Sequence, residues 1–166
     1  MIELSVQPES WPIRGTFTIS RGSKTAADVV VVQLEDNGAV GRGECVPYGR
    51  YGETVDSVIE QITGLREAIA GGMDRAALQQ ALPAGAARNA LDCALWDLEA
   101  KATGRGIAEL AGVPAPSPVA TAFTLSVDTP ERMREAAQAR RDAPLLKLKL
   151  AGEGDMERVQ AVREGA

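Results

Sequence analysis

The stretch Pro144-Leu-Leu-Lys-Leu-Lys-Leu150 decides the fold, because its alternating pattern predicts a strand with two unlike faces. Successive side chains of a strand point to opposite faces, so the leucines at every second position would share one face. Lys147 and Lys149 would then project together from the other face. Two ammonium groups held side by side repel each other, which lowers the pKa of an amine toward the range of a general base.

The segments around this strand predict alternating strands and helices. Val119 to Val127 has the pattern of a strand, and Asp128-Thr129-Pro130 would cap a helix that extends to about Arg141. Asp155 to Arg163 predicts the next helix. Strands and helices that alternate at this spacing favour a parallel sheet or a (β/α) barrel. Two strands cannot close such a structure, so we expect the chain to be the N-terminal part of a longer polypeptide.

The lysine pair has two interpretations. On the solvated face of an edge strand, lysines simply deter aggregation. The strands of a parallel sheet are instead covered on both faces, where burying unpaired ammonium groups costs several kcal/mol. Lys149 also lies near the C-terminal end of its strand, which is where barrel enzymes place their chemistry. The context therefore favours a functional site.

The first two thirds of the chain predict a separate domain that begins with sheet. Strand patterns cover three segments, Ile2 to Gln7, Asp28 to Glu35 and Ala39 to Val46. Asn37-Gly38 between the last two is a strong hairpin signal. Thr16 to Lys24 is polar and contains glycine, so we expect a mobile loop there, and we expect a second loop over Pro47 to Glu53.

Helices follow the predicted sheet. Apolar residues at helical spacing predict one helix that is capped by Thr54 and extends to Ile69, and Asp74 would cap a short helix. The clearest helix covers Ala86 to Thr103, with a stripe of alanine and leucine that implies close packing. The proline-rich run at 114–118 is the best domain boundary.

The composition excludes several classes of partner. The net charge is -5 with no long run of either sign, which argues against nucleic acid and anionic membranes. No apolar run approaches the roughly twenty residues that span a bilayer, and the N-terminus lacks the pattern of a signal peptide. Cys45 and Cys93 are expected to be isolated buried thiols in a reducing cytoplasm. The chain has no histidine, the commonest acid–base residue.

The segment Ala87-Arg-Asn-Ala-Leu-Asp-Cys-Ala-Leu-Trp-Asp-Leu-Glu-Ala-Lys-Ala-Thr-Gly104, followed by Leu110-Ala-Gly112, resembles the signature helix of the enolase superfamily. The Lys-x-Lys strand follows at the usual separation. Within the superfamily the chain resembles the muconate-lactonizing subgroup, and most of all the dipeptide epimerases that act on L-Ala-D/L-Glu. Three further segments carry this narrower resemblance: Thr16 to Lys24, Gly43 to Glu53 and Leu82 to Asn89.

The resemblance implies an α/β fold made of two parts. Residues 1–115 would form an α+β capping domain, with a three-stranded meander and helices. Residues 116–166 would form the first two βα units of a modified TIM barrel, truncated after the second barrel strand and helix.

The resemblance also implies roles for individual residues. Lys149 would be the base, while Lys147 would lower its pKa and help to neutralise the substrate carboxylate. Four residues would bind the substrate: Arg21, Lys24, Tyr51 and Thr124. For the loop residues among them, solvated charge or packing between domains is an equal alternative.

The implied reaction is a Mg²⁺-dependent epimerisation of a small dipeptide by 1,1-proton transfer through an enediolate. The metal ligands and the opposing base would lie beyond Ala166, so we expect no metal ligand within this chain and no activity from it alone. Other members of the subgroup share Lys-x-Lys, so muconate cycloisomerase and o-succinylbenzoate synthase stay open, as does a non-catalytic truncated capping module. The formation of a homo-oligomer is also left open.

Overall fold

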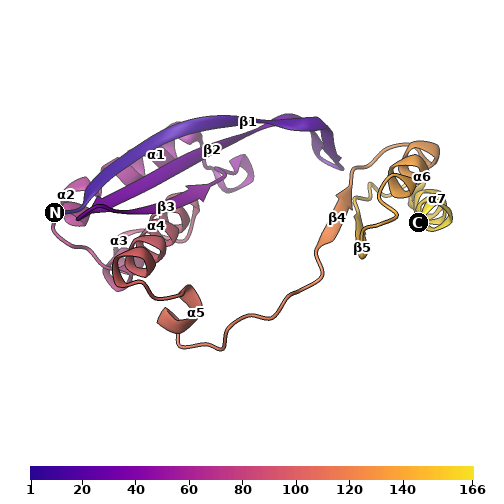
Figure 1. Cartoon of the computed structure of the whole chain (residues 1–166). Helices are drawn as coiled ribbons and strands as arrows, with labels where there is room; N and C mark the ends of the chain where they lie inside the picture. Colours follow the sequence, from indigo (N-terminus) through magenta and orange to yellow (C-terminus); the bar gives the residue numbers. More distant parts are fainter. The chain divides into compact units, whose positions relative to one another are not determined.

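The computed structural model describes residues 1–166 and divides into two compact units (Figure 1). Unit 1 comprises Met1–Trp11 and Ala27–Pro116, and unit 2 comprises Pro12–Ala26 and Ser117–Ala166. The tip of the first hairpin, Pro12–Ala26, therefore belongs with the C-terminal segment rather than with the sheet from which it extends. None of the helices combines the length and the apolar character needed to cross a membrane.

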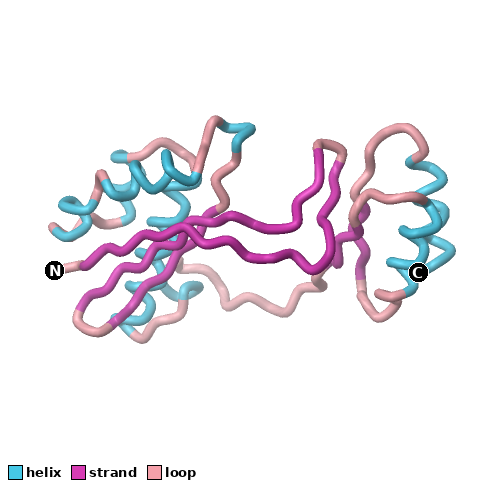
Figure 2. Tube along the Cα trace, turned by 90° about the horizontal axis from the view of Figure 1, so that it is seen from above, coloured by secondary structure: helices cyan, strands magenta, loops and turns pink.

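The sheet contains β1 (Glu3–Ile19), β2 (Gly22–Asp36) and β3 (Ala39–Cys45), side by side in that order (Figure 2). β2 and β3 are antiparallel, with Val30 opposite Cys45. The turn between them is Asn37-Gly38, whose φ angles of 49° and 82° have the positive sign that a tight two-residue hairpin requires. The predicted hairpin is thus confirmed.

The loop predicted at Thr16–Lys24 is wrong, because the segment forms the end of a β-hairpin. β1 continues through Ile19 and β2 starts at Gly22, so only Ser20 and Arg21 form the turn. Threonine, phenylalanine and isoleucine are strand formers, and paired strands satisfy each other's backbone groups as far as the turn. These preferences outweigh the polar character of the segment.

The helices of unit 1 are η1 (Gly49–Tyr51), α1 (Val55–Thr63), α2 (Arg66–Ala70), α3 (Arg75–Ala81), α4 (Ala86–Thr103) and α5 (Ile107–Leu110). The predicted caps are confirmed: Thr54 accepts a hydrogen bond from the Ser57 N–H, and Asp74 accepts one from the Ala77 N–H. The single helix predicted up to Ile69 is wrong, because α1 ends before Gly64. Glycine is a poor helix former, and it separates α1 from α2.

α4 lies directly against β3 (Figure 1), and small residues make this close approach possible. A Cβ atom at Gly43 would stand 1.9 Å from the carbonyl oxygen of Ala90, and one at Gly41 would stand 2.3 Å from that of Ala94. The backbone of the strand therefore rests on the backbone of the helix. The predicted stripe of small residues on α4 is confirmed as the buried face of that helix.

Asp97 fastens α4 to β3 from the edge of this interface. Its Oδ2 accepts hydrogen bonds from the Arg42 N–H and the Lys101 Nζ, both at 2.7 Å. Partial burial raises the pKa of Asp97, but the hydrogen bonds from Lys101 and from the Arg42 backbone outweigh it and leave the pKa lowered. The carboxylate of Asp97 therefore has a structural role at the contact between α4 and β3.

The C-terminal part of unit 2 contains β4 (Ala122–Leu125), α6 (Pro130–Gln138), β5 (Leu145–Leu148) and α7 (Asp155–Gly165). β4 and β5 are parallel, and α6 and α7 lie side by side against them (Figure 2). The predicted alternation of strands and helices is confirmed, although both strands are shorter than expected because each is paired only where it faces the other. Leu146 and Leu148 contact the core, whereas Leu150, expected with them, is 43% exposed.

Unit 2 has a small core, so we expect its strands to exchange their amide hydrogens faster than those of unit 1. Only Leu125, Met133, Ala137 and Val162 are buried in its core cluster. A core of this size supplies only a few kcal/mol, so amides of β4 and β5 should exchange at least ~10-fold faster than those of β2 and β3. Hydrogen exchange followed by NMR measures both in one sample. Equal protection in the two units would contradict this expectation.

Candidate functional site

The two parallel strands of unit 2 present a polar face. The register places Thr124 beside Lys147, and a hydrogen bond of 3.0 Å from the Lys149 N–H to the Leu125 carbonyl extends the pairing to Ser126 and Lys149. Side chains two residues apart on a strand share a face. Thr124, Ser126, Lys147 and Lys149 therefore form one surface, called the polar face below. The leucines between them contact α6 and α7 on the other side of the sheet.

Three of the six residues that were proposed from the sequence meet on the polar face. Thr124 and Lys149 are half-buried, while Lys147 is exposed. Both lysines come from β5 or its immediate extension, and Thr124 comes from the neighbouring strand. An amine beside a hydroxyl and a second amine can exchange protons and attract an anionic ligand.

The hairpin tip, Pro12–Ala26, contacts the polar face within unit 2. The Val127 N–H donates to the Thr18 carbonyl at 3.1 Å, and the Thr18 N–H donates to the Ser126 Oγ at 3.2 Å. The centre of the Phe17 ring lies 5.8 Å from the Nζ of Lys149. An aromatic ring thus stands beside the amine that was predicted to be the base.

Arg21 and Lys24 lie on the same hairpin tip, with both side chains exposed. Arg21 occupies the turn itself, and Lys24 lies at the start of β2. The structure therefore places two cations in the segment that contacts the polar face. Their predicted contact with a substrate stays a prediction.

Tyr51 belongs to unit 1, where it is 76% exposed and its ring centre lies 5.8 Å from that of Tyr48. Glu53 holds this loop to the start of α4: one carboxylate oxygen accepts from the Tyr48 N–H at 2.9 Å, and the other accepts from the Ala86 N–H at 2.6 Å. The sequence contained no motif for this bridge, because Glu53 and Ala86 lie 33 residues apart.

Sequence reasoning missed Ser126 and Phe17 as parts of the site. Ser126 could have been found, because Thr124 and Ser126 alternate with apolar residues just as the two lysines do. Phe17 had no such signal, since it lies far from the lysine strand in the sequence and reaches it only through the tertiary structure.

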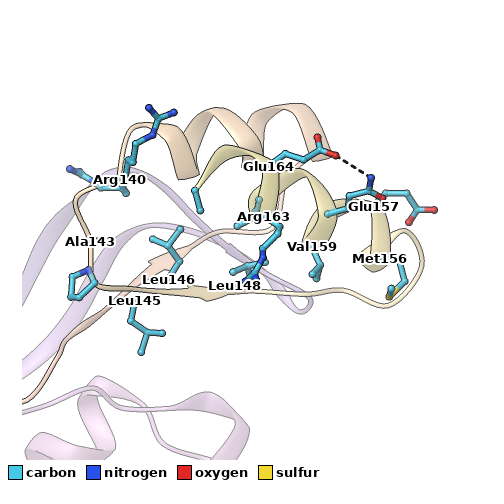
Figure 3. A pocket seen from close by; sticks show the side chains of 15 residues that line it. Arg140, Ala143, Leu145, Leu146, Leu148, Met156, Glu157, Val159, Arg163 and Glu164 are labelled. Carbon is cyan, nitrogen blue, oxygen red and sulfur yellow. Dashed lines mark hydrogen bonds between the residues drawn. The ribbon is translucent and has the colours of Figure 1, made fainter.

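A separate apolar hollow of about 820 Å³ lies between β5 and α7 (Figure 3). Leu146 and Leu148 line it from the strand, and Met156 and Val159 line it from the helix. Neither lysine lines it. The hollow therefore belongs to the helix-covered side of the strand and is distinct from the polar face.

Neither cysteine belongs to a metal site. Cys45 is buried, and burial raises the pKa of its thiol to about 11. Cys93 is exposed, so the expectation that both thiols are buried is wrong for this residue, which lies on the outer side of α4. No three histidine, cysteine, aspartate or glutamate side chains converge in a way that could hold a metal ion.

Residues 1–112 match the family described as mandelate racemase / muconate lactonizing enzyme, N-terminal domain. The chain is also 46% identical, over 165 residues, to the L-Ala-D/L-Glu epimerase of Escherichia coli, a match that covers 98% of this chain and 51% of the relative.

Two solved structures agree with this match. An enolase family member from Agrobacterium tumefaciens with homology to dipeptide epimerases, with bound sodium and L-Ala-L-Glu, has a TM-score of 0.94 at 44% identity, over 100% of this chain and 51% of that one. The dipeptide epimerase from Enterococcus faecalis, complexed with Mg and L-Leu-L-Tyr, has a TM-score of 0.86 at 30% identity, over 99% and 50%. The chain spans about half the length of the relatives it matches. It belongs to the mandelate racemase / muconate lactonizing enzyme family of the enolase superfamily.

Proposed function

We infer that this chain is part of a dipeptide epimerase of the L-Ala-D/L-Glu type, and that it supplies one of the two bases of the reaction. Residues 1–115 would be the capping domain and residues 116–166 the first two βα units of the barrel. The observation that carries the proposal is the pair of lysines on the polar face, next to the hairpin tip. The identity to a curated epimerase supports the choice of substrate class.

Lys149 would remove the proton from the carbon next to the substrate carboxylate. The ammonium group of Lys147, which projects from the same face, offers a counter-ion to the carboxylate, on which negative charge builds as the proton leaves. A second base on the opposite side of the substrate would return a proton and invert the centre.

The remaining residues would bind and orient the dipeptide. Arg21 and Lys24 on the hairpin tip can pair with the side-chain carboxylate of a glutamate residue. Thr124 offers a hydroxyl beside Lys147, and Tyr51 would border the substrate from the capping domain.

The residues of this chain do not fit a magnesium site, because no three carboxylates converge in it. The likeness to a dipeptide epimerase complexed with Mg supports a Mg²⁺ requirement for the whole enzyme. The ligands and the opposing base would then have to come from a part of the protein other than these 166 residues.

A chimera tests the proposal. Residues 1–166 replace the matching half of the Escherichia coli epimerase, to which they are 46% identical, and the protein is incubated with Mg²⁺ and L-Ala-L-Glu. We expect formation of L-Ala-D-Glu, followed by chiral chromatography, and no product from the 166-residue chain alone. A chimera that is folded by circular dichroism and gel filtration but inactive would overturn the proposal. The same chimera is also assayed with muconate and with the precursor of o-succinylbenzoate. These assays test the muconate cycloisomerase and o-succinylbenzoate synthase activities.

A further inference from the structure

Ser126 is the one polar side chain of the polar face whose hydrogen bonds reach another element. It lies one residue beyond β4, is half-buried, and stands next to Lys149 across the parallel pair. Its hydroxyl accepts a hydrogen bond from the Thr18 N–H at 3.2 Å and has the Thr16 carbonyl as acceptor at 3.3 Å. A single side chain therefore binds the backbone of the hairpin tip at two points.

These two points lie on either side of Phe17. The Val127 N–H adds a third hydrogen bond, to the Thr18 carbonyl at 3.1 Å. With its neighbours fixed on both sides, Phe17 has little backbone freedom, and its ring centre stands 5.8 Å from the Nζ of Lys149. The position of the ring over the amine thus depends on the bonds made by Ser126 and Val127.

The hydrogen bonds between the Ser126 hydroxyl and the hairpin tip are weak enough to suit a segment that opens and closes. The bonds of the Ser126 hydroxyl are partly exposed, and hydrogen bonds that water can replace contribute little net free energy. A segment that must admit a substrate and then exclude water needs contacts that can break and re-form in each turnover. The two hydrogen bonds of the Ser126 hydroxyl can break and re-form more readily than a buried apolar contact could.

We propose that Ser126 is a positioning residue that latches the hairpin tip over Lys149, and so controls access of water and substrate to the lysine pair. This inference rests on the function proposed above. Ser126 does not take part in proton transfer. It acts through Phe17, whose ring it holds beside the base.

The first test measures the latch itself in the 166-residue chain. Ser126→Ala removes both bonds of the hydroxyl, whereas Ser126→Thr keeps a hydroxyl at the same place. Ser23→Ala is the matched control, because the Ser23 Oγ bonds only to the Thr18 Oγ1 inside the tip, at 2.9 Å. We expect the Thr18 and Val127 amides to exchange about tenfold faster in Ser126→Ala, and at the original rate in the other two variants.

The second test measures the consequence in the chimera. Ser126→Ala should lower kcat/KM for L-Ala-L-Glu about tenfold, mainly through a raised KM, and Ser126→Thr should restore it. Unchanged exchange at Thr18 and Val127 in Ser126→Ala would overturn the latch. Faster exchange with unchanged kcat/KM would overturn its role in positioning.

The two tests separate this inference from the proposed function. A chimera that is inactive with Ser126 in place would contradict the proposed epimerase activity, and with it the positioning role of Ser126. The exchange result in the 166-residue chain would still decide whether Ser126 holds the hairpin tip.

Discussion

Replacing Lys149 with methionine in the chimera should lower the rate of L-Ala-L-Glu epimerisation by about a thousandfold or more, because general-base catalysis commonly contributes 10²–10⁴-fold. Methionine fills a similar volume but cannot accept a proton. The side chain is half-buried beside Phe17, so water is poorly placed to replace the lost amine. The rate is measured by chiral separation of the two dipeptides.

The matched control is Lys101→Met. Lys101 is the one lysine of unit 1, and it pairs with Asp97 at 2.7 Å. Its loss removes the same charge from the chain, so we expect less than about a twofold change in rate, since a surface ion pair contributes little. A chimera that keeps more than about a tenth of its activity after the Lys149 substitution would show that another group is the base.

Exchange of the substrate α-hydrogen with D₂O distinguishes the base on one face of the substrate from the base on the other. If one base serves each face, Lys149→Met should abolish solvent exchange of the α-hydrogen in one dipeptide epimer and leave residual exchange in the other. Proton NMR of L-Ala-L-Glu and L-Ala-D-Glu, incubated separately, measures both rates. An equal loss of α-hydrogen exchange in both epimers would mean that Lys149 is not the base for one face of the substrate alone.

Replacing Gly43 with alanine should destabilise unit 1 by about 3 kcal/mol or more, because overpacking of a tight contact commonly costs 1–3 kcal/mol. The added Cβ would stand 1.9 Å from the Ala90 carbonyl oxygen, which belongs to the helix backbone and cannot move as a side chain would. For a unit of the size of unit 1, a loss of about 3 kcal/mol corresponds to a fall in Tm of roughly 12–24 °C. Thermal unfolding followed by circular dichroism gives the value.

Gly49→Ala is the control for this substitution. A Cβ at Gly49 would meet no atom within 4 Å, and its backbone does not have the positive φ that favours glycine. We expect its Tm to stay within about 2 °C of the unsubstituted chain, as surface substitutions usually do. Equal stability of the Gly43 and Gly49 variants would mean that α4 is not held against β3 as closely as the structure shows.

Local patterns in the sequence predicted much of the fold. The caps at Thr54 and Asp74 and the turn at Asn37-Gly38 depend on neighbouring residues alone, so they could be predicted without tertiary information. The split after Thr63 also had a local signal in Gly64, which the spacing of the apolar residues outweighed in the prediction. The extension of β1 through Ile19 had no sufficient local signal, because it depends on the pairing of β1 with β2.

By itself the sequence determined the alternation around Lys147 and Lys149, and hence that two amines project from one face of a strand, because side-chain direction in a strand follows from the period of two. Only the tertiary structure decided what stands against that face. Thr18 and Ser126 lie 108 residues apart, and the hairpin tip is held at the end of β4, beside the lysine strand, by hydrogen bonds that no local pattern encodes. The backbone groups of a hairpin tip can bond to any suitably placed partner, so their choice of Ser126 depends on the folded arrangement of unit 2.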